Sequence, residues 1–276
     1  MKFQTTDGVW IDYLDQGKGN PVILVTGFGG YKEIWVLQVQ YLLKMGYRVI
    51  TYDHRNQGGS QRNVFPQSMN RLILDLRELV QKLNIHAPLL IGHSMGASVC
   101  YGYIDQFSDV AGVIGVDQTP KMLNTKDWSF GFLNANENNY QEVSKISPEV
   151  QETLNGLDQR VIGELFNAKN KNPFRREANY QLLLDHFRKD WRETLANTTV
   201  PVMLMSAVQS PYYKAAFVDE VSGTNSCVSG VKLNNCGHVI MAEVPDEFNQ
   251  LLRHFLLKNH RRQVISKDLC QNNIRD

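Results

Sequence analysis

One short stretch limits what this chain can fold into more than any other: the motif Gly92-His93-Ser94-Met95-Gly96, which directly follows the apolar run 88–91. That run is typical of a buried strand, and the residues after Gly96 are typical of a helix start. A strand that enters a helix through so tight a turn forces its central residue into a strained backbone conformation, for which only glycine neighbours leave room. We therefore expect Ser94 at the carboxyl edge of a sheet, beside a helix N-terminus that can stabilise an oxyanion.

Apolar patterning along the rest of the chain predicts an α/β fold with a mostly parallel sheet of about eight strands. Short β-prone runs alternate with helical patterns, which indicates helices on both faces of the sheet. An antiparallel hairpin is expected around Asp7-Gly8. Further strands are predicted at 21–26, 47–52, 88–91, 110–116, 201–205 and 228–233, and helices at 32–45, 69–83, 97–106 and 244–256.

Residues 120–199 interrupt this alternation, because they are rich in Asn, mostly helical in pattern and without a convincing strand. We interpret them as an insertion that forms a helical lid over the carboxyl edge of a core domain made of residues 1–119 and 200–276. Trp128 and Phe132 belong to an apolar run that could line a substrate pocket or equally anchor the lid to the core. Tyr212 is a further candidate for the pocket.

Composition argues against several classes of partner. A net charge of +1 gives no electrostatic reason to expect nucleic acid or an anionic membrane surface. The sequence has no apolar signal segment and no stretch of eighteen apolar residues, so we expect no membrane insertion. The four cysteines show no metal-ligand spacing, which predicts a cytoplasmic protein with reduced thiols and no bound metal. A homodimer is compatible with the sequence.

Three further segments, together with the serine motif, resemble the α/β-hydrolase family. Segment 26–30 (Thr-Gly-Phe-Gly-Gly) resembles the family's oxyanion loop, with Thr26 where histidine is usual. Segment 53–60 resembles its Asp-x-Arg-Gly-x-Gly-x-Ser turn, and segment 235–238 resembles the loop that carries the catalytic histidine. The resemblance covers residues 9–257. Within the family, the chain resembles the carboxylesterase and cofactor-free haloperoxidase-like branch. This resemblance implies a hydrolase that needs no cofactor.

The chemistry of the family explains these residue types. A serine hydroxyl is a weak nucleophile until a base takes its proton, and histidine titrates near neutral pH. The resemblance assigns Ser94 as the nucleophile and His238 as the base, while His93 shapes the turn. The backbone N–H groups of Phe28 and Met95 are expected to form the oxyanion hole.

The family also uses an acidic residue to orient the catalytic histidine, and here this sequence departs from the family pattern. The usual position after the penultimate strand holds Ser210, which cannot balance an imidazolium charge. We expect Asp117, at the end of the predicted strand 110–116, to replace it, since some family branches place the acid there. The alternative is that Asp117 only caps its loop, in which case the site uses another acid or works as a Ser–His dyad. Asp53 is expected to be structural, with Arg55 or the turn backbone as its partner.

The leading interpretation is a carboxylic-ester hydrolase that cleaves a small or medium acyl ester through an acyl-Ser94 intermediate. A perhydrolase, a lactonase or a thioesterase would use the same residues. A ligand-binding sensor on a hydrolase fold would explain the missing acid at Ser210, but it would not need to retain both Ser94 and His238.

Overall fold

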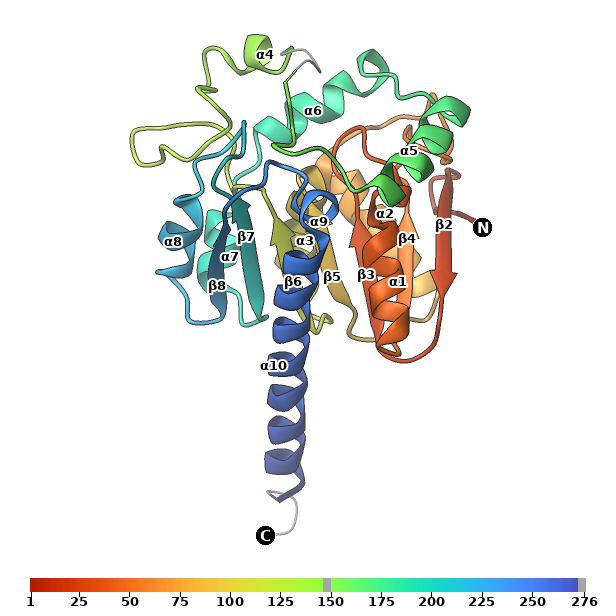
Figure 1. Cartoon of the computed structure of the whole chain (residues 1–276), viewed down its shortest axis with the longest axis vertical. Helices are drawn as coiled ribbons and strands as arrows, with labels where there is room; N and C mark the ends of the chain where they lie inside the picture. The colour runs from red at the N-terminus through yellow and green to blue at the C-terminus, as the bar shows by residue number, and fades with distance from the viewer. Residues whose placement is uncertain (146–149, 273–276) are drawn as a thin grey trace.

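An eight-stranded sheet in the order β1-β2-β4-β3-β5-β6-β7-β8 forms the centre of the computed structural model (Figure 1), which describes residues 1–145 and 150–272, with side chains as far as residue 259. β1 pairs with β2 and β2 with β4 in antiparallel fashion, and all other neighbours are parallel. The fold class is therefore confirmed. The strands are β1 (Lys2–Gln4), β2 (Trp10–Gln16), β3 (Pro21–Val25), β4 (Arg48–Tyr52), β5 (Leu89–His93), β6 (Gly112–Val116), β7 (Val202–Ala207) and β8 (Val228–Leu233).

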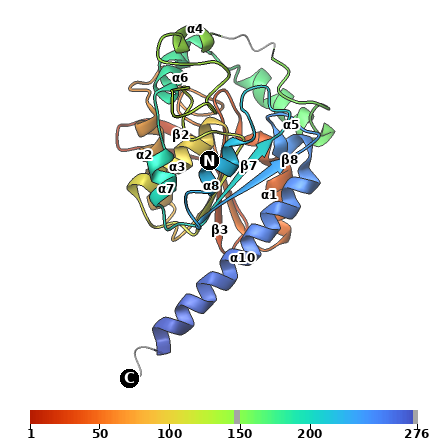
Figure 2. The same cartoon turned by 90° about the vertical axis from the view of Figure 1, so that its left-hand side faces the viewer.

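Helices cover both faces of the sheet, so the central strands are buried on two sides (Figure 2). In β3, Ile23 and Val25 pack into one apolar cluster, whereas Val22 and Leu24 pack into the other. This alternation explains why the parallel strands appear in the sequence as continuous apolar runs. One face carries α2 (Met69–Lys82), α3 (Met95–Gln106), α7 (Arg192–Asn197) and α8 (Phe217–Ser222); the other carries α1 (Val36–Lys44), α9 (Ile240–Glu243) and α10 (Pro245–Asn272).

Two helix boundaries differ from the sequence prediction. The helix expected at 32–45 begins as the separate 3₁₀ turn η1 (Lys32–Trp35), a common geometry at helix starts. The final helix does not end near residue 256: α10 continues to Asn272 and extends well beyond the sheet (Figures 1 and 2). None of the described helices, α10 included, is long and apolar enough to cross a membrane.

Segment 120–199 is helical and mostly lies over the carboxyl ends of the parallel strands (Figure 1). It has a small apolar cluster of its own, which includes Met122, Tyr140 and Phe187. Its last helix, α7, instead packs beside the sheet against α3 and α8. The other elements of the segment are α4 (Tyr140–Val143), α5 (Gln159–Lys171), η2 (Glu177–Asn179) and α6 (Tyr180–Phe187).

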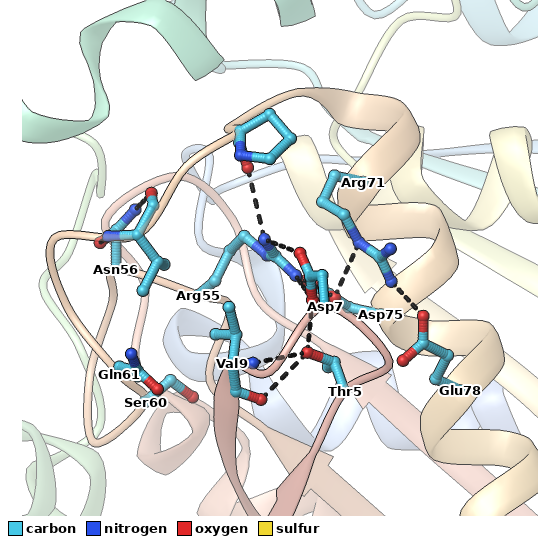
Figure 3. Close-up of polar contacts among 12 residues, drawn as sticks. Thr5, Asp7, Val9, Arg55, Asn56, Ser60, Gln61, Arg71, Asp75 and Glu78 are labelled. Atoms are coloured by element: carbon cyan, nitrogen blue, oxygen red, sulfur yellow. Dashed lines mark hydrogen bonds and ion pairs between the residues drawn. The ribbon is translucent and has the colours of Figure 1, made fainter.

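The turn 53–60 after β4 is held by buried ion pairs, although not the pair that we expected for Asp53. Asp53 binds Lys32 Nζ at 2.8 Å and accepts the Gly59 N–H at 2.8 Å, so the turn backbone is indeed one partner. Arg55 is not the other partner, because its guanidinium binds Asp7 in the hairpin and Asp75 on α2 instead (Figure 3).

Arg55 joins three elements through two carboxylates (Figure 3). Its guanidinium is fully buried and donates to Asp75 on α2 from Nε and Nη2, at 2.7 Å each. It also donates to Asp7, in the turn between β1 and β2, at 2.9 and 3.0 Å. A buried guanidinium needs such paired acceptors, because an uncompensated charge in the interior is costly. The network therefore fixes the turn 53–60, from which Gln57 reaches the candidate site.

Candidate active site

Ser94 occupies a strained turn between β5 and α3, as the motif predicts. Its φ is 53° and its ψ is −129°, a combination that is costly for a residue with a side chain. A Cβ at position 92 would lie 2.3 Å from the carbonyl oxygen of Gly96, and one at position 96 would lie 2.4 Å from that of Val25. Gly92 is therefore required for β5 and α3 to meet this closely, and Gly96 is required for α3 to approach the end of β3. The Ser94 N–H donates to the Val116 carbonyl at 2.9 Å, which ties the turn to β6.

The loop after β3 lies directly against this serine. A Cβ at position 27 would lie 2.9 Å from Ser94 Cβ, so only glycine fits there. Gln57 Oε1 accepts the Gly29 N–H at 2.8 Å and holds the loop in place. Among the described residues, neither the backbone N–H of Phe28 nor that of Met95 has a hydrogen-bond acceptor. Both N–H groups remain available to a developing oxyanion, Met95 as the first residue of α3.

Asp117 and His238 form a buried hydrogen-bonded pair. His238 Nδ1–H donates to Asp117 Oδ2 at 2.7 Å, and neither side chain is more than 4% exposed. Ser210 Oγ donates to the same carboxylate oxygen at 2.6 Å. Asp117 Oδ1 accepts the Ser206 hydroxyl and the Ala207 N–H, at 2.9 Å each. The carboxylate after β6 thus reaches the histidine, while the serine at the usual acid position supports it.

His93 supports the backbone of the histidine loop rather than the reacting atoms. Its Nε2–H donates to the His238 carbonyl at 3.0 Å. The pKa of His93 is held well below its usual value mainly by burial and, to a smaller extent, by the nearby His238 ring. The His93 imidazole is therefore neutral at physiological pH, in agreement with the expectation that it shapes the turn.

Segment 120–199 is bonded directly to the same loop. The Glu152 carbonyl accepts the His238 N–H at 2.6 Å. Glu243 bridges the two parts, since its Oε2 accepts the Gly237 N–H at 2.7 Å and its Oε1 accepts the Asn155 N–H at 2.6 Å. The position of the histidine therefore depends on this segment as well as on the sheet.

Ser94 and His238 open onto one cavity of about 510 Å³. No hydrogen bond joins their side chains among the described residues; such contacts commonly tighten when substrate binds. Phe132 and Tyr212, two of the predicted pocket residues, line the cavity and stack on each other with ring centroids 5.0 Å apart. Other apolar wall residues are Phe28, Met122, Phe174, Leu183, Phe187 and Tyr213.

The expectation that Trp128 lines this pocket needs correction. Its side chain is 4% exposed and belongs to the apolar cluster on the face of the sheet that carries α2, α3, α7 and α8. Its Nε1–H donates to the Lys121 carbonyl at 2.9 Å, and the Arg192 guanidinium lies 5.4 Å from its ring. Trp128 therefore anchors segment 120–199 to the core, which was the alternative interpretation of this apolar run.

Comparison with known proteins agrees with this geometry. The family model described as alpha/beta hydrolase fold matches residues 20–245. The chain belongs to the α/β-hydrolase family. Among relatives, it is 32% identical over 100 residues to the non-heme chloroperoxidase CPO-A1 of Kitasatospora aureofaciens, an alignment that covers 36% of each chain. The chain spans only about two-fifths of the length of the first curated relatives that it matches.

Solved structures of other α/β-hydrolases share the whole fold. An esterase from Exiguobacterium antarcticum superimposes with a TM-score of 0.80 at 18% identity, covering 92% of this chain and 98% of its own. The bromoperoxidase from Bacillus anthracis gives 0.79 at 21% identity, covering 93% and 99%. At such identities the likeness establishes the fold alone. The predicted family, with its esterase and haloperoxidase-like relatives, is confirmed.

Several cavity residues of this α/β-hydrolase had no signal in the sequence. His186 on α6, which lacked any catalytic context there, lines the cavity and bonds Ser98 Oγ through Nε2 at 2.9 Å. Glu152, Lys169 and Arg176 also line it. All four come from segment 120–199, where no motif indicates which residues turn inward.

Proposed function

We propose that this α/β-hydrolase cleaves carboxylic esters with a small or medium acyl group through an acyl-Ser94 intermediate. The observation that supports this most is the 2.7 Å hydrogen bond between Asp117 and His238, in the wall of the cavity that Ser94 enters. A pure binding protein has no need of a buried carboxylate with four donors around it, one of them the histidine. In this proposal segment 120–199 is the lid whose inner surface selects the substrate.

The reaction follows from the geometry. Ser94 Oγ attacks the ester carbonyl as His238 Nε2 takes its proton, and Asp117 stabilises the resulting imidazolium. The N–H groups of Phe28 and Met95 donate to the oxyanion of the tetrahedral intermediate. His238 then gives the proton to the departing alcohol. Water attacks the acyl-enzyme by the same route and releases the acid and free Ser94.

A second candidate, perhydrolysis, is favoured by the names of the relatives, several of which are non-heme haloperoxidases. Hydrogen peroxide would replace water in the second step and attack the acyl carbonyl. The bond between Ser94 and the acyl group would break, a peroxy acid would leave, and the proton from peroxide would return to Ser94 through His238. Release of peroxy acid from acetate esters and hydrogen peroxide would be the readout.

The test compares wild type, Ser94→Ala and Ser98→Ala on p-nitrophenyl acetate, butyrate and octanoate. Ser98 is a matched control, because it is also a serine of this region with a histidine partner, yet it lies inside α3. We expect Ser94→Ala to lower kcat by at least about 10⁴-fold, while Ser98→Ala keeps turnover. A fluorophosphonate probe should label the peptide at Ser94. Turnover and labelling that survive Ser94→Ala would refute the proposal.

A further inference from the structure

Among the described residues that line the candidate catalytic cavity, cationic side chains outnumber carboxylates. Two cationic side chains, Lys169 and Arg176, line it together with one carboxylate, Glu152. His186 adds no charge, because burial lowers the pKa of its ring from 6.5 to about 3. The Glu152 carboxylate is occupied by the Tyr212 hydroxyl, which donates to it at 2.8 Å. With an uncharged substrate, the positive charges of Lys169 and Arg176 would have no counter-charge from the substrate.

Arg176 is the cation best placed to act on a substrate. It is half-buried, and its guanidinium carbon lies 5.5 Å from the centre of the Phe28 ring. Phe28 supplies one of the two proposed oxyanion N–H groups, so Arg176 lies close to the reacting centre. Lys169, by contrast, is exposed at the end of α5.

Arg176 is held in place without losing its donor capacity. Its Nη2 donates to the carbonyl of Ser144, the residue that ends α4, at 2.6 Å. The backbone three residues before Arg176 is fixed to the chain that follows the turn 53–60, because Arg62 Nη1 donates to the Pro173 carbonyl at 2.8 Å. Among the described residues, the bond to Ser144 is the one hydrogen bond of the Arg176 side chain, which leaves most of its five guanidinium donors to a ligand.

Arg176 also differs in its partners from two other arginines of segment 120–199. Arg160 and Arg192 each bind an aspartate at 2.7–2.8 Å. Among the described residues, no carboxylate lies within salt-bridge distance of Arg176. A carboxylate is the partner that fits a planar guanidinium best, through two parallel hydrogen bonds.

We infer that the cavity selects substrates whose acyl part ends in a carboxylate, such as monoesters or lactones of short dicarboxylic acids, and that Arg176 pairs with that carboxylate. The inference rests on the proposed function, because it places the scissile carbonyl at Ser94. The carboxylate lies a few bonds from that carbonyl, on the side of the Phe28 ring. Arg176 is thus the residue that determines specificity.

The experiment compares two p-nitrophenyl esters of equal acyl length, the hemiglutarate, which carries a carboxylate, and the neutral pentanoate. We expect wild type to prefer the hemiglutarate in kcat/KM. Arg176→Gln should lower this preference by about tenfold to hundredfold, while Arg176→Lys should retain part of it. Glu152→Gln should raise the preference, because it removes a repelling charge. Lys171→Gln is the matched control, since Lys171 is exposed on α5 and lies outside the cavity.

The outcomes separate this inference from the proposed function. If both esters are cleaved and Arg176→Gln slows them equally, Arg176 only holds the lid, and the inference is overturned while the esterase proposal stands. If neither ester is cleaved, the esterase proposal fails. The inference about Arg176 is then tested by measuring the binding of glutarate and of dimethyl glutarate by calorimetry. The inference holds if wild type binds glutarate at least tenfold more tightly than Arg176→Gln does, while the two proteins bind dimethyl glutarate equally. Equal or absent glutarate binding would overturn it.

Discussion

Asp117 is an acid in an unusual backbone conformation. Its φ of 46° is in the left-handed region, which aspartate tolerates better than most residues. This conformation turns the carboxylate toward the end of β7, where Ser206, Ala207 and Ser210 donate to it. Each oxygen of the carboxylate thus accepts two hydrogen bonds, which fixes its orientation and with it the position of the His238 ring. The serine at position 210 has become a support for an acid that lies one strand away.

This arrangement predicts that the acid can be moved back. Asp117→Asn should lower kcat by up to about 10⁴-fold, because it favours the wrong tautomer of His238. In the exchanged variant Asp117→Ser/Ser210→Asp, a carboxylate returns to the usual family position within reach of the histidine. We expect this variant to recover at least tenfold in kcat over Asp117→Ser alone, measured with p-nitrophenyl butyrate. Full activity in Asp117→Asn would show that the site works as a Ser–His dyad.

At the scale of elements, the turn 53–60 is where the hairpin, the sheet and α2 are joined (Figure 3). Asp75→Asn removes one of the two carboxylates that compensate the fully buried Arg55, leaves only Asp7, and should cost about 3 kcal/mol of unfolding free energy. Asp109→Asn is the control, because its partner Arg77 is on the surface and Asp109 is 46% exposed. That change should cost about 1 kcal/mol or less. Urea denaturation measures both, and equal losses would contradict a special role for Arg55.

The elements that carry the site follow from the sequence because their geometry is local. Gly92 and Gly96 fix the serine turn through contacts only a few residues apart in sequence or with the adjacent strand, and apolar runs mark the strands whose carboxyl edges meet. The strand pattern places Asp117 at the same edge, and the family resemblance makes it the candidate acid. The inner wall of segment 120–199 is not, because its residues face the cavity through long-range packing. Arg176 and His186 are therefore visible only in the folded chain, and Trp128 proves to be an anchor.

For the molecule as a whole, three buried histidines link stability to pH. His54, His93 and His186 lie in the turn after β4, at the end of β5 and on α6. Burial lowers the pKa of His54 from 6.5 to about 4 and that of His186 to about 3, and it holds that of His93 well below 6.5. In the unfolded chain each histidine binds a proton near pH 6.5. The unfolded chain therefore holds more protons than the folded protein at mildly acidic pH.

The free energy of unfolding should accordingly be constant above about pH 7 and fall as the pH drops from 6.5 toward 4, by about 1.4 kcal/mol per pH unit for each histidine. Asp7 acts in a lower window, since hydrogen bonds from Arg55 hold its pKa at about 2 and its contribution is lost only below about pH 4. Urea denaturation between pH 8 and pH 5 measures the slope. In His186→Gln it should be shallower by about 1.4 kcal/mol per pH unit, whereas His254→Gln, at an exposed position on α10, should leave it unchanged. Identical slopes in wild type and His186→Gln would mean that the pKa of His186 is the same in the folded and the unfolded protein, so that this cavity residue becomes charged in the folded protein below about pH 6.5.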